Sequence, residues 1–122
     1  MNQKNIFTGI SLVLVVQGLV FFIMASTIAS DAFPSLAPDC QDAVHKVIRV
    51  VGVLYILVGL VAYSARNTPQ VLWAFAVGFI LLASITLKHI WKDHINVPIY
   101  VLVIQFLIAI LCVSLWGQND KK

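Results

Sequence analysis

Residues 6–28 read IFTGISLVLVVQGLVFFIMASTI, an apolar run without a charged side chain. At a rise of about 1.5 Å per residue, a helix of this length crosses a hydrocarbon core about 30 Å thick. Three further apolar runs follow at residues 43–65, 69–87 and 97–116. We therefore expect an all-α integral membrane protein, a single transmembrane domain over residues 1–122 that forms a four-helix up-down bundle.

The composition supports this class. The chain is 61% hydrophobic and 11% charged, with a mean hydropathy of +0.97, and a soluble domain of 122 residues would still expose much of that apolar surface to water. The net charge of +3 comes from basic residues near the ends of the apolar runs, where they contact lipid headgroups or set orientation. We expect the lipid bilayer as a partner and no nucleic-acid binding.

The first apolar run also has a signal-peptide interpretation, because Lys4 precedes it and small residues end it. An h-region is usually about 7 to 15 residues long, shorter than this run. We expect the segment to be retained as a helix.

The count of Lys and Arg does not decide the orientation of the chain in the membrane, because both predicted faces carry the same number. With a cytoplasmic N-terminus, one face carries Lys4, Arg66, Lys121 and Lys122, and the other carries Lys46, Arg49, Lys88 and Lys92. We favour cytoplasmic termini, because Arg49 and Lys88 lie within the ends of apolar runs and Asp31, Asp39 and Asp42 crowd the first long loop. The Lys-rich tail is compatible with a bacterial inner membrane. Dual topology remains an alternative.

Three histidines and one cysteine fall on the same predicted face, the one that carries the two longer loops. They are His45, His89, His94 and Cys40. Imidazole and thiolate suit zinc or copper, but helical positions five apart, such as His89 and His94, would point about 140° from each other. We expect interfacial anchoring and no metal or other cofactor, with a metal site or histidine-based sensing as alternatives.

The second run carries a stripe at three- and four-residue steps. It comprises Asp42, His45, Arg49, Gly52, Ile56, Gly59 and Tyr63. Gly52 and Gly59 would let another helix approach closely, which predicts a packing face. Arg49 begins inside the apolar region, so we expect it to clasp another helix or to hold an anionic ligand.

Two amides lie near the middle of the first and last runs. An unpaired amide is costly in hydrocarbon, so Gln17 and Gln105 should bond across the bundle or to a partner subunit. The alternative is that they line a pore or a substrate path.

Residues 49–59, RVVGVLYILVG, resemble the second helix of small bacterial four-helix membrane proteins of the DoxX-like and DUF4345-type families. The resemblance implies four helices and an Arg/Gly packing face. It implies no activity.

These features predict a small, non-enzymatic membrane protein that acts by helix packing, as a homo-oligomer or as an accessory subunit of a membrane complex. The alternative is a small channel, transporter or lipid- or ligand-binding protein whose polar site surrounds Arg49. The candidates for that site are Arg49, His45, Asp42, Gln17 and Gln105. The chain has no Glu, and no Asp within the expected spans, which argues against a carboxylate-based proton-coupled carrier.

Overall fold

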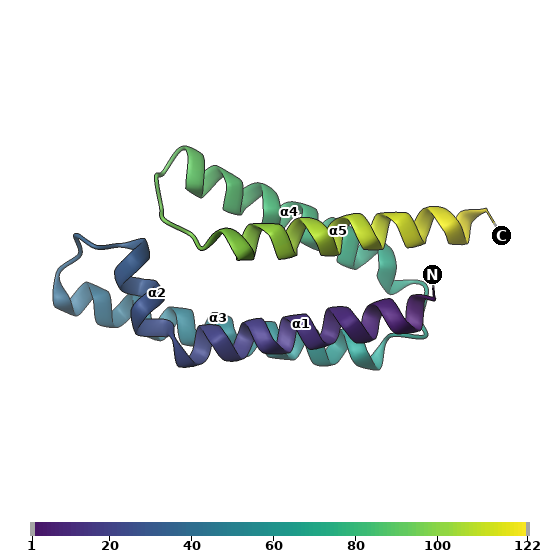
Figure 1. Cartoon of the computed structure of the whole chain (residues 1–122), viewed down its shortest axis with the longest axis horizontal. Coiled ribbons are helices and arrows are strands. Elements are labelled where there is room, and N and C mark those ends of the chain that lie inside the picture. The colour runs from purple at the N-terminus through teal and green to yellow at the C-terminus, as the bar shows by residue number, and fades with distance from the viewer. Residues whose placement is uncertain (1, 122) are drawn as a thin grey trace. The chain divides into compact units, whose positions relative to one another are not determined.

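The computed structural model describes residues 2–121, and every regular element in them is helical (Figure 1). The helices are α1 Gln3–Ile23, α2 Ala25–Ala32, α3 Pro38–Ser64, α4 Val71–Trp91 and α5 Ile99–Asp120. All except α2 are long and apolar enough to span a bilayer. The expected class is confirmed: this is an all-α membrane protein with four spans. Lys122, counted above for orientation, lies outside the described residues.

The chain forms two compact units, and Thr8–Ser64 is one of them. In this unit α1 and α3 run antiparallel, since Gly18 lies against Gly52 while Ser11 lies against Gly59. The short helix α2 packs on α3. The unit is therefore a helical hairpin with an extra helix in its turn.

The second unit joins the chain from Ala65 onward with the chain up to Phe7. Helices α4 and α5 pack together as a hairpin (Figure 1). The start of α1 belongs here: the Phe7 and Phe75 rings meet edge-to-face with centroids 5.3 Å apart, and Gln3 Nε2 donates to the Thr68 carbonyl at 3.1 Å. Along α4 the buried side chains follow helical steps. They are Leu72, Ala76, Phe79 and Ala83.

The run at 6–28 differs most from its expected form, because it belongs to two helices. At Met24 the backbone leaves helical geometry, with φ −98° and ψ 21°. Beyond it, Ser30 Oγ donates to the Ser26 carbonyl at 2.9 Å, a back-bond that often bends helices. The helix α2 ends before Pro34, since a proline disfavours helical geometry in the residue that precedes it.

The other spans also shift from 43–65, 69–87 and 97–116. The helix α3 begins at Pro38, which suits the first position of a helix, and takes in the polar residues from Asp39. The helix α4 continues through Lys88, whose positive charge suits a helix C-terminus, and His89. Pro98 has a non-helical ψ of 130°, so α5 begins at the next residue, Ile99. Hydropathy alone misplaced these ends because polar residues complete the helices.

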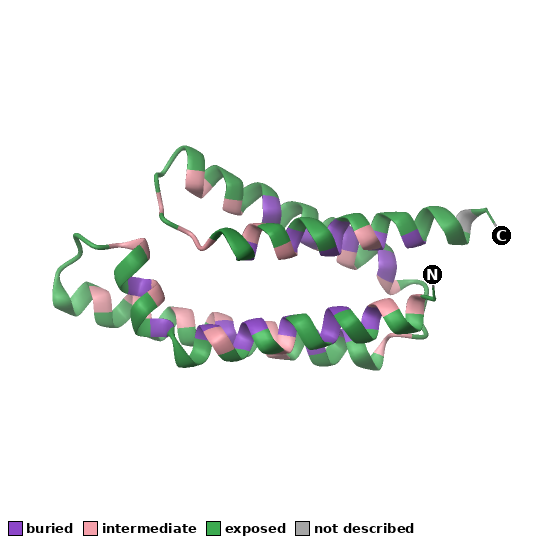
Figure 2. Ribbon diagram, viewed as in Figure 1, coloured by how far each residue is buried: buried purple, intermediate pink, exposed green. Residues whose placement is uncertain are grey.

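The buried residues lie in narrow stripes (Figure 2). Many large apolar residues of the spans are exposed. The contrast is sharpest between α1, with 39% of its most apolar window buried, and α3, with 17%. The outer face of α3 is therefore exposed and apolar within its unit, as expected of a surface that meets lipid or another helix.

Candidate functional site

The hairpin of α1 and α3 is held by direct backbone contact. A Cβ added at Gly18 would lie 2.4 Å from the Gly52 carbonyl oxygen, and one added at Gly52 would lie 2.7 Å from the Gly18 oxygen. A Cβ at Gly59 would meet Val15 Cγ2 at 2.9 Å and the Ser11 oxygen at 3.0 Å. Both glycines singled out in α3 thus lie at a helix contact within the chain.

Sequence reasoning missed Gly18. Its signal was available, because Ser11, Gly18 and Ala25 recur every seven residues and so lie along one side of a helix. All three are buried. A periodic row of small residues was the clue to the face of α1 that contacts α3.

Next to the glycine contact, toward the end of α1 and the start of α3, lies a group of aromatic rings. Phe21 and Tyr55 pack edge-to-face with centroids 5.6 Å apart. Arg49 is exposed, and its Cζ lies 5.4 Å from the centre of the Phe22 ring, a cation–π distance. Among residues 2–121 the structure gives Arg49 no carboxylate partner. The guanidinium is therefore positioned by an aromatic face and keeps its hydrogen-bond donors available.

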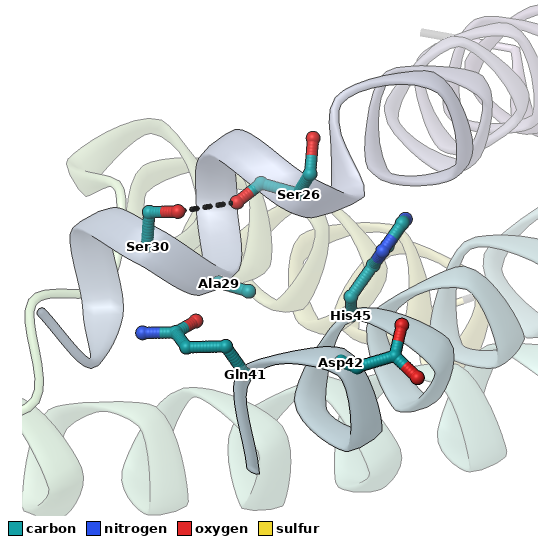
Figure 3. Close-up of a pocket in the computed structure, with 6 residues that line it drawn as sticks. All are labelled: Ser26, Ala29, Ser30, Gln41, Asp42 and His45. Atoms are coloured by element: carbon teal, nitrogen blue, oxygen red, sulfur yellow. Dashed lines mark hydrogen bonds between the residues drawn. The ribbon is translucent and has the colours of Figure 1, made fainter. Parts of the chain in front are cut away.

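A polar cavity of about 240 Å³ lies between α2 and the first turns of α3 (Figure 3). Its lining consists of Ser26, Ala29, Ser30, Gln41, Asp42 and His45. The structure thus brings two of the predicted site residues, Asp42 and His45, to one cavity. The serines were not predicted, because small residues at the end of an apolar run carry no distinctive signal.

The hydrogen bonds at this cavity leave one acceptor unused. Gln41 Nε2 donates to the Phe33 carbonyl, whereas Gln41 Oε1 is buried and has no partner among the described residues. Figure 3 shows the Gln41 amide and the His45 ring between the two helices, while the Asp42 carboxylate turns to one side. There Asp42 pairs with Lys46, Oδ2 to Nζ 2.9 Å. The cavity therefore offers oxygen acceptors beside the ion pair of Asp42 and Lys46.

The three histidines are divided between the two units. His45 belongs to the unit Thr8–Ser64, and His89 and His94 belong to the other. His89 Nδ1 lies 2.6 Å from Asp93 Oδ2, and His94 takes a left-handed backbone, φ 52°, just after α4. Cys40 is a free, exposed thiol. Within the described part of the chain, no three His, Cys, Asp or Glu side chains come close enough to hold a metal ion.

Both intramembrane amides are buried. Gln17 is 3% exposed and Gln105 is 2% exposed, and they lie in different units. In residues 2–121 neither Oε1 nor Nε2 of Gln17 has a hydrogen-bond partner. A bond from Gln17 across the bundle or to a partner subunit stays a prediction.

Comparison with known proteins leaves the site to be interpreted from its own geometry. No protein-family model matches the chain, and it matches no curated protein and no solved structure. The resemblance to the DoxX-like and DUF4345-type families stays a prediction.

Proposed function

We propose that this protein is a non-enzymatic membrane protein that binds a lipid or another small ligand at a polar site formed by α2 and α3. The cavity lined by Ser26, Ser30, Gln41, Asp42 and His45 carries this proposal. It lies where the spans α1 and α3 meet the connecting segment, so a ligand would enter from the membrane interface. Arg49, one helical turn beyond His45, supplies the nearby cation.

The glycine contact shifts the balance toward ligand binding. Gly52 and Gly59 offered a face for a second subunit, but α1 of the same chain occupies both positions. A partner helix would have to displace α1 to use them. The polar cavity stays open at the surface, as a ligand site must.

Assembly as a homo-oligomer or as an accessory subunit is the second candidate, and a different surface favours it. A Cβ at Gly78 would meet nothing within 4 Å, and Ala74, one turn earlier on α4, is exposed. Small residues four apart allow a helix to approach closely in a membrane. This face of α4 is the place where a partner helix would pack.

Native mass spectrometry from mild detergent separates the two candidates. Under ligand binding, the wild-type protein carries a bound small molecule that Arg49→Ala loses, while the number of subunits stays the same. Arg66→Ala, in the turn that follows the other end of α3, is the matched control and retains the molecule. Under assembly, the protein carries no small molecule and runs as a defined oligomer or with a foreign subunit, which Gly78→Leu breaks up. That second result would contradict the proposal.

The proposed location is a bacterial inner membrane with both termini in the cytoplasm. The segment that follows α1, with α2 and the start of α3, would then face the periplasm. The supporting observation is the row of acidic residues there, at Asp31, Asp39 and Asp42. Acidic residues count for little in topology, so the accessibility of Cys40 decides the matter.

A further inference from the structure

The cavity between α2 and α3 favours a ligand that donates hydrogen bonds. Gln41 Oε1 is buried without a partner, and the nitrogen of the same amide already donates to the Phe33 carbonyl. The Ser30 hydroxyl donates its hydrogen to the Ser26 carbonyl and keeps its lone pairs. A buried acceptor without a donor is costly, so a ligand that supplies an N–H or O–H is favoured here.

The charge of the cavity lining favours some hydrogen-bond-donating ligands over others. Asp42 is the carboxylate of the cavity lining. Its Oδ2 already pairs with Lys46, and its Oδ1 is left to accept, together with Gln41 Oε1, from a cation that has N–H groups. A primary ammonium has three such hydrogens. A quaternary ammonium has none and is usually bound by aromatic cages, and the lining of this cavity contains no Phe, Tyr or Trp.

Further along α3, toward the middle of the span, Arg49 favours an anionic group of the ligand. Lys46 pairs with Asp42 at 2.9 Å, whereas Arg49 has no carboxylate partner among residues 2–121. Arg49 lies about 6 Å along the helix axis from His45, and side chains in a helix lean toward its N-terminus, here toward the cavity. A guanidinium with available donors suits a phosphate, which it binds through two parallel hydrogen bonds.

Beyond Arg49, toward the middle of the span, α3 carries an exposed apolar stripe. Val53, Leu57 and Leu60 follow Arg49 on the same side of α3 and are 44%, 52% and 53% exposed. Acceptors, a guanidinium and an exposed apolar stripe therefore succeed one another along a single helix. An aminophospholipid has its amine, phosphate and acyl chains in the same order.

We propose that the cavity and Arg49 together hold a phosphate ester that carries a protonated primary amine, a phosphoethanolamine group. The amine enters the cavity and donates to Gln41 Oε1 beside Asp42, and the phosphate accepts from Arg49. The volume of about 240 Å³ lies below the roughly 300 to 1,000 Å³ of sites for drug-sized molecules, which suits so small a group. This inference rests on the proposed ligand site and names what the site binds.

The test is a methylation series. Full-length protein in detergent is titrated with dioleoyl phosphatidylethanolamine, with its N-monomethyl and N-dimethyl forms and with the choline lipid, and binding is measured by native mass spectrometry. Each methyl group removes one N–H donor and leaves the phosphate unchanged. Dioleoyl phosphatidylglycerol tests the anion alone, and water-soluble O-phosphoethanolamine tests whether the acyl chains are needed.

We expect affinity to fall along the series, with the choline lipid about tenfold weaker than the ethanolamine lipid, as expected for the loss of hydrogen bonds to a charged group. Gln41→Leu and Asp42→Asn should each flatten the series. Asp39→Asn, which removes a carboxylate from the same end of α3 but outside the cavity lining, should leave it intact. Competition by O-phosphoethanolamine would assign the group to a soluble ester, and its failure to compete would assign it to the bilayer lipid.

Two results would overturn the inference and leave the ligand site standing. The first is equal affinity across the series with binding still lost in Gln41→Leu, and the second is tighter binding of phosphatidylglycerol. Binding that none of the cavity variants changes would overturn the inference as well. Failure of the site itself shows separately, as wild-type protein that carries no bound molecule when it leaves its native membrane.

Discussion

The contact between Gly18 and Gly52 gives the sharpest stability prediction. A Cβ at Gly18 would lie 2.4 Å from the Gly52 oxygen and 2.9 Å from the Ile56 nitrogen, both backbone atoms that cannot rotate away. Van der Waals contact begins near 3.4 Å, so α1 and α3 must separate by about 1 Å around this point. Overpacking of this kind costs about 1 to 3 kcal/mol, and Gly18→Ala and Gly52→Ala should each lower the free energy of unfolding by about that amount.

The assay is reversible unfolding in mixed micelles by sodium dodecyl sulfate, followed by tryptophan fluorescence. Gly78→Ala is the matched control, because its Cβ meets nothing within 4 Å, and it should be neutral or slightly stabilising. The double variant should cost less than the sum of the single ones, since one Cβ already separates the helices. A Gly18→Ala protein as stable as wild type, or a Gly78→Ala protein just as destabilised, would refute the reasoning.

Three further predictions follow from burial. Cys40 should react with a membrane-impermeant maleimide added to intact cells, while the buried Cys112 reacts only after unfolding; labelling of Cys40 only in broken cells would place the termini outside. Phe7→Ala removes a fully buried ring and should destabilise the protein in the micelle assay. The loss should be smaller than the about 3 to 5 kcal/mol typical of soluble cores, because lipid replaces the lost apolar contacts. Phe106→Ala, at a half-exposed ring, is the control and should change the free energy of unfolding little. Gln17→Leu should raise the free energy of unfolding by about 1 kcal/mol, since it removes a buried amide without a partner; a loss of stability would reveal a clasp.

The spans were predictable because each is long enough and apolar enough to have no stable place in water. Their ends were not, because hydropathy stops at the first charge while a helix continues as long as polar residues suit its terminus. Asp39 at the start of α3 and Lys88 at the end of α4 are such residues. The break at Met24 between α1 and α2 falls inside one continuous apolar run, so an average of hydropathy does not reveal it.

The site was predictable only in part. Arg49, His45 and Asp42 were singled out because charge in an apolar helix is conspicuous; Asp42 and His45 line the cavity, and Arg49 stays a predicted site residue. Their setting was not, since Ser26, Ser30 and Gln41 come from a segment whose fold a sequence pattern does not define. The ring of Phe22 as the neighbour of Arg49 follows from how α1 crosses α3, and that crossing depends on the glycine contacts.

The central claim is that the cavity between α2 and α3 binds a ligand, and photo-cross-linking tests it most directly. A small diazirine amino acid replaces Ser26 in the lining of the cavity, or Ser84 on the exposed surface of α4 as the control, and cells are irradiated before purification. The account predicts a single small-molecule or lipid adduct at position 26, lost in Asp42→Asn and absent at position 84. A cross-link from position 26 to another protein, or the same mixture of lipids at both positions, would contradict it.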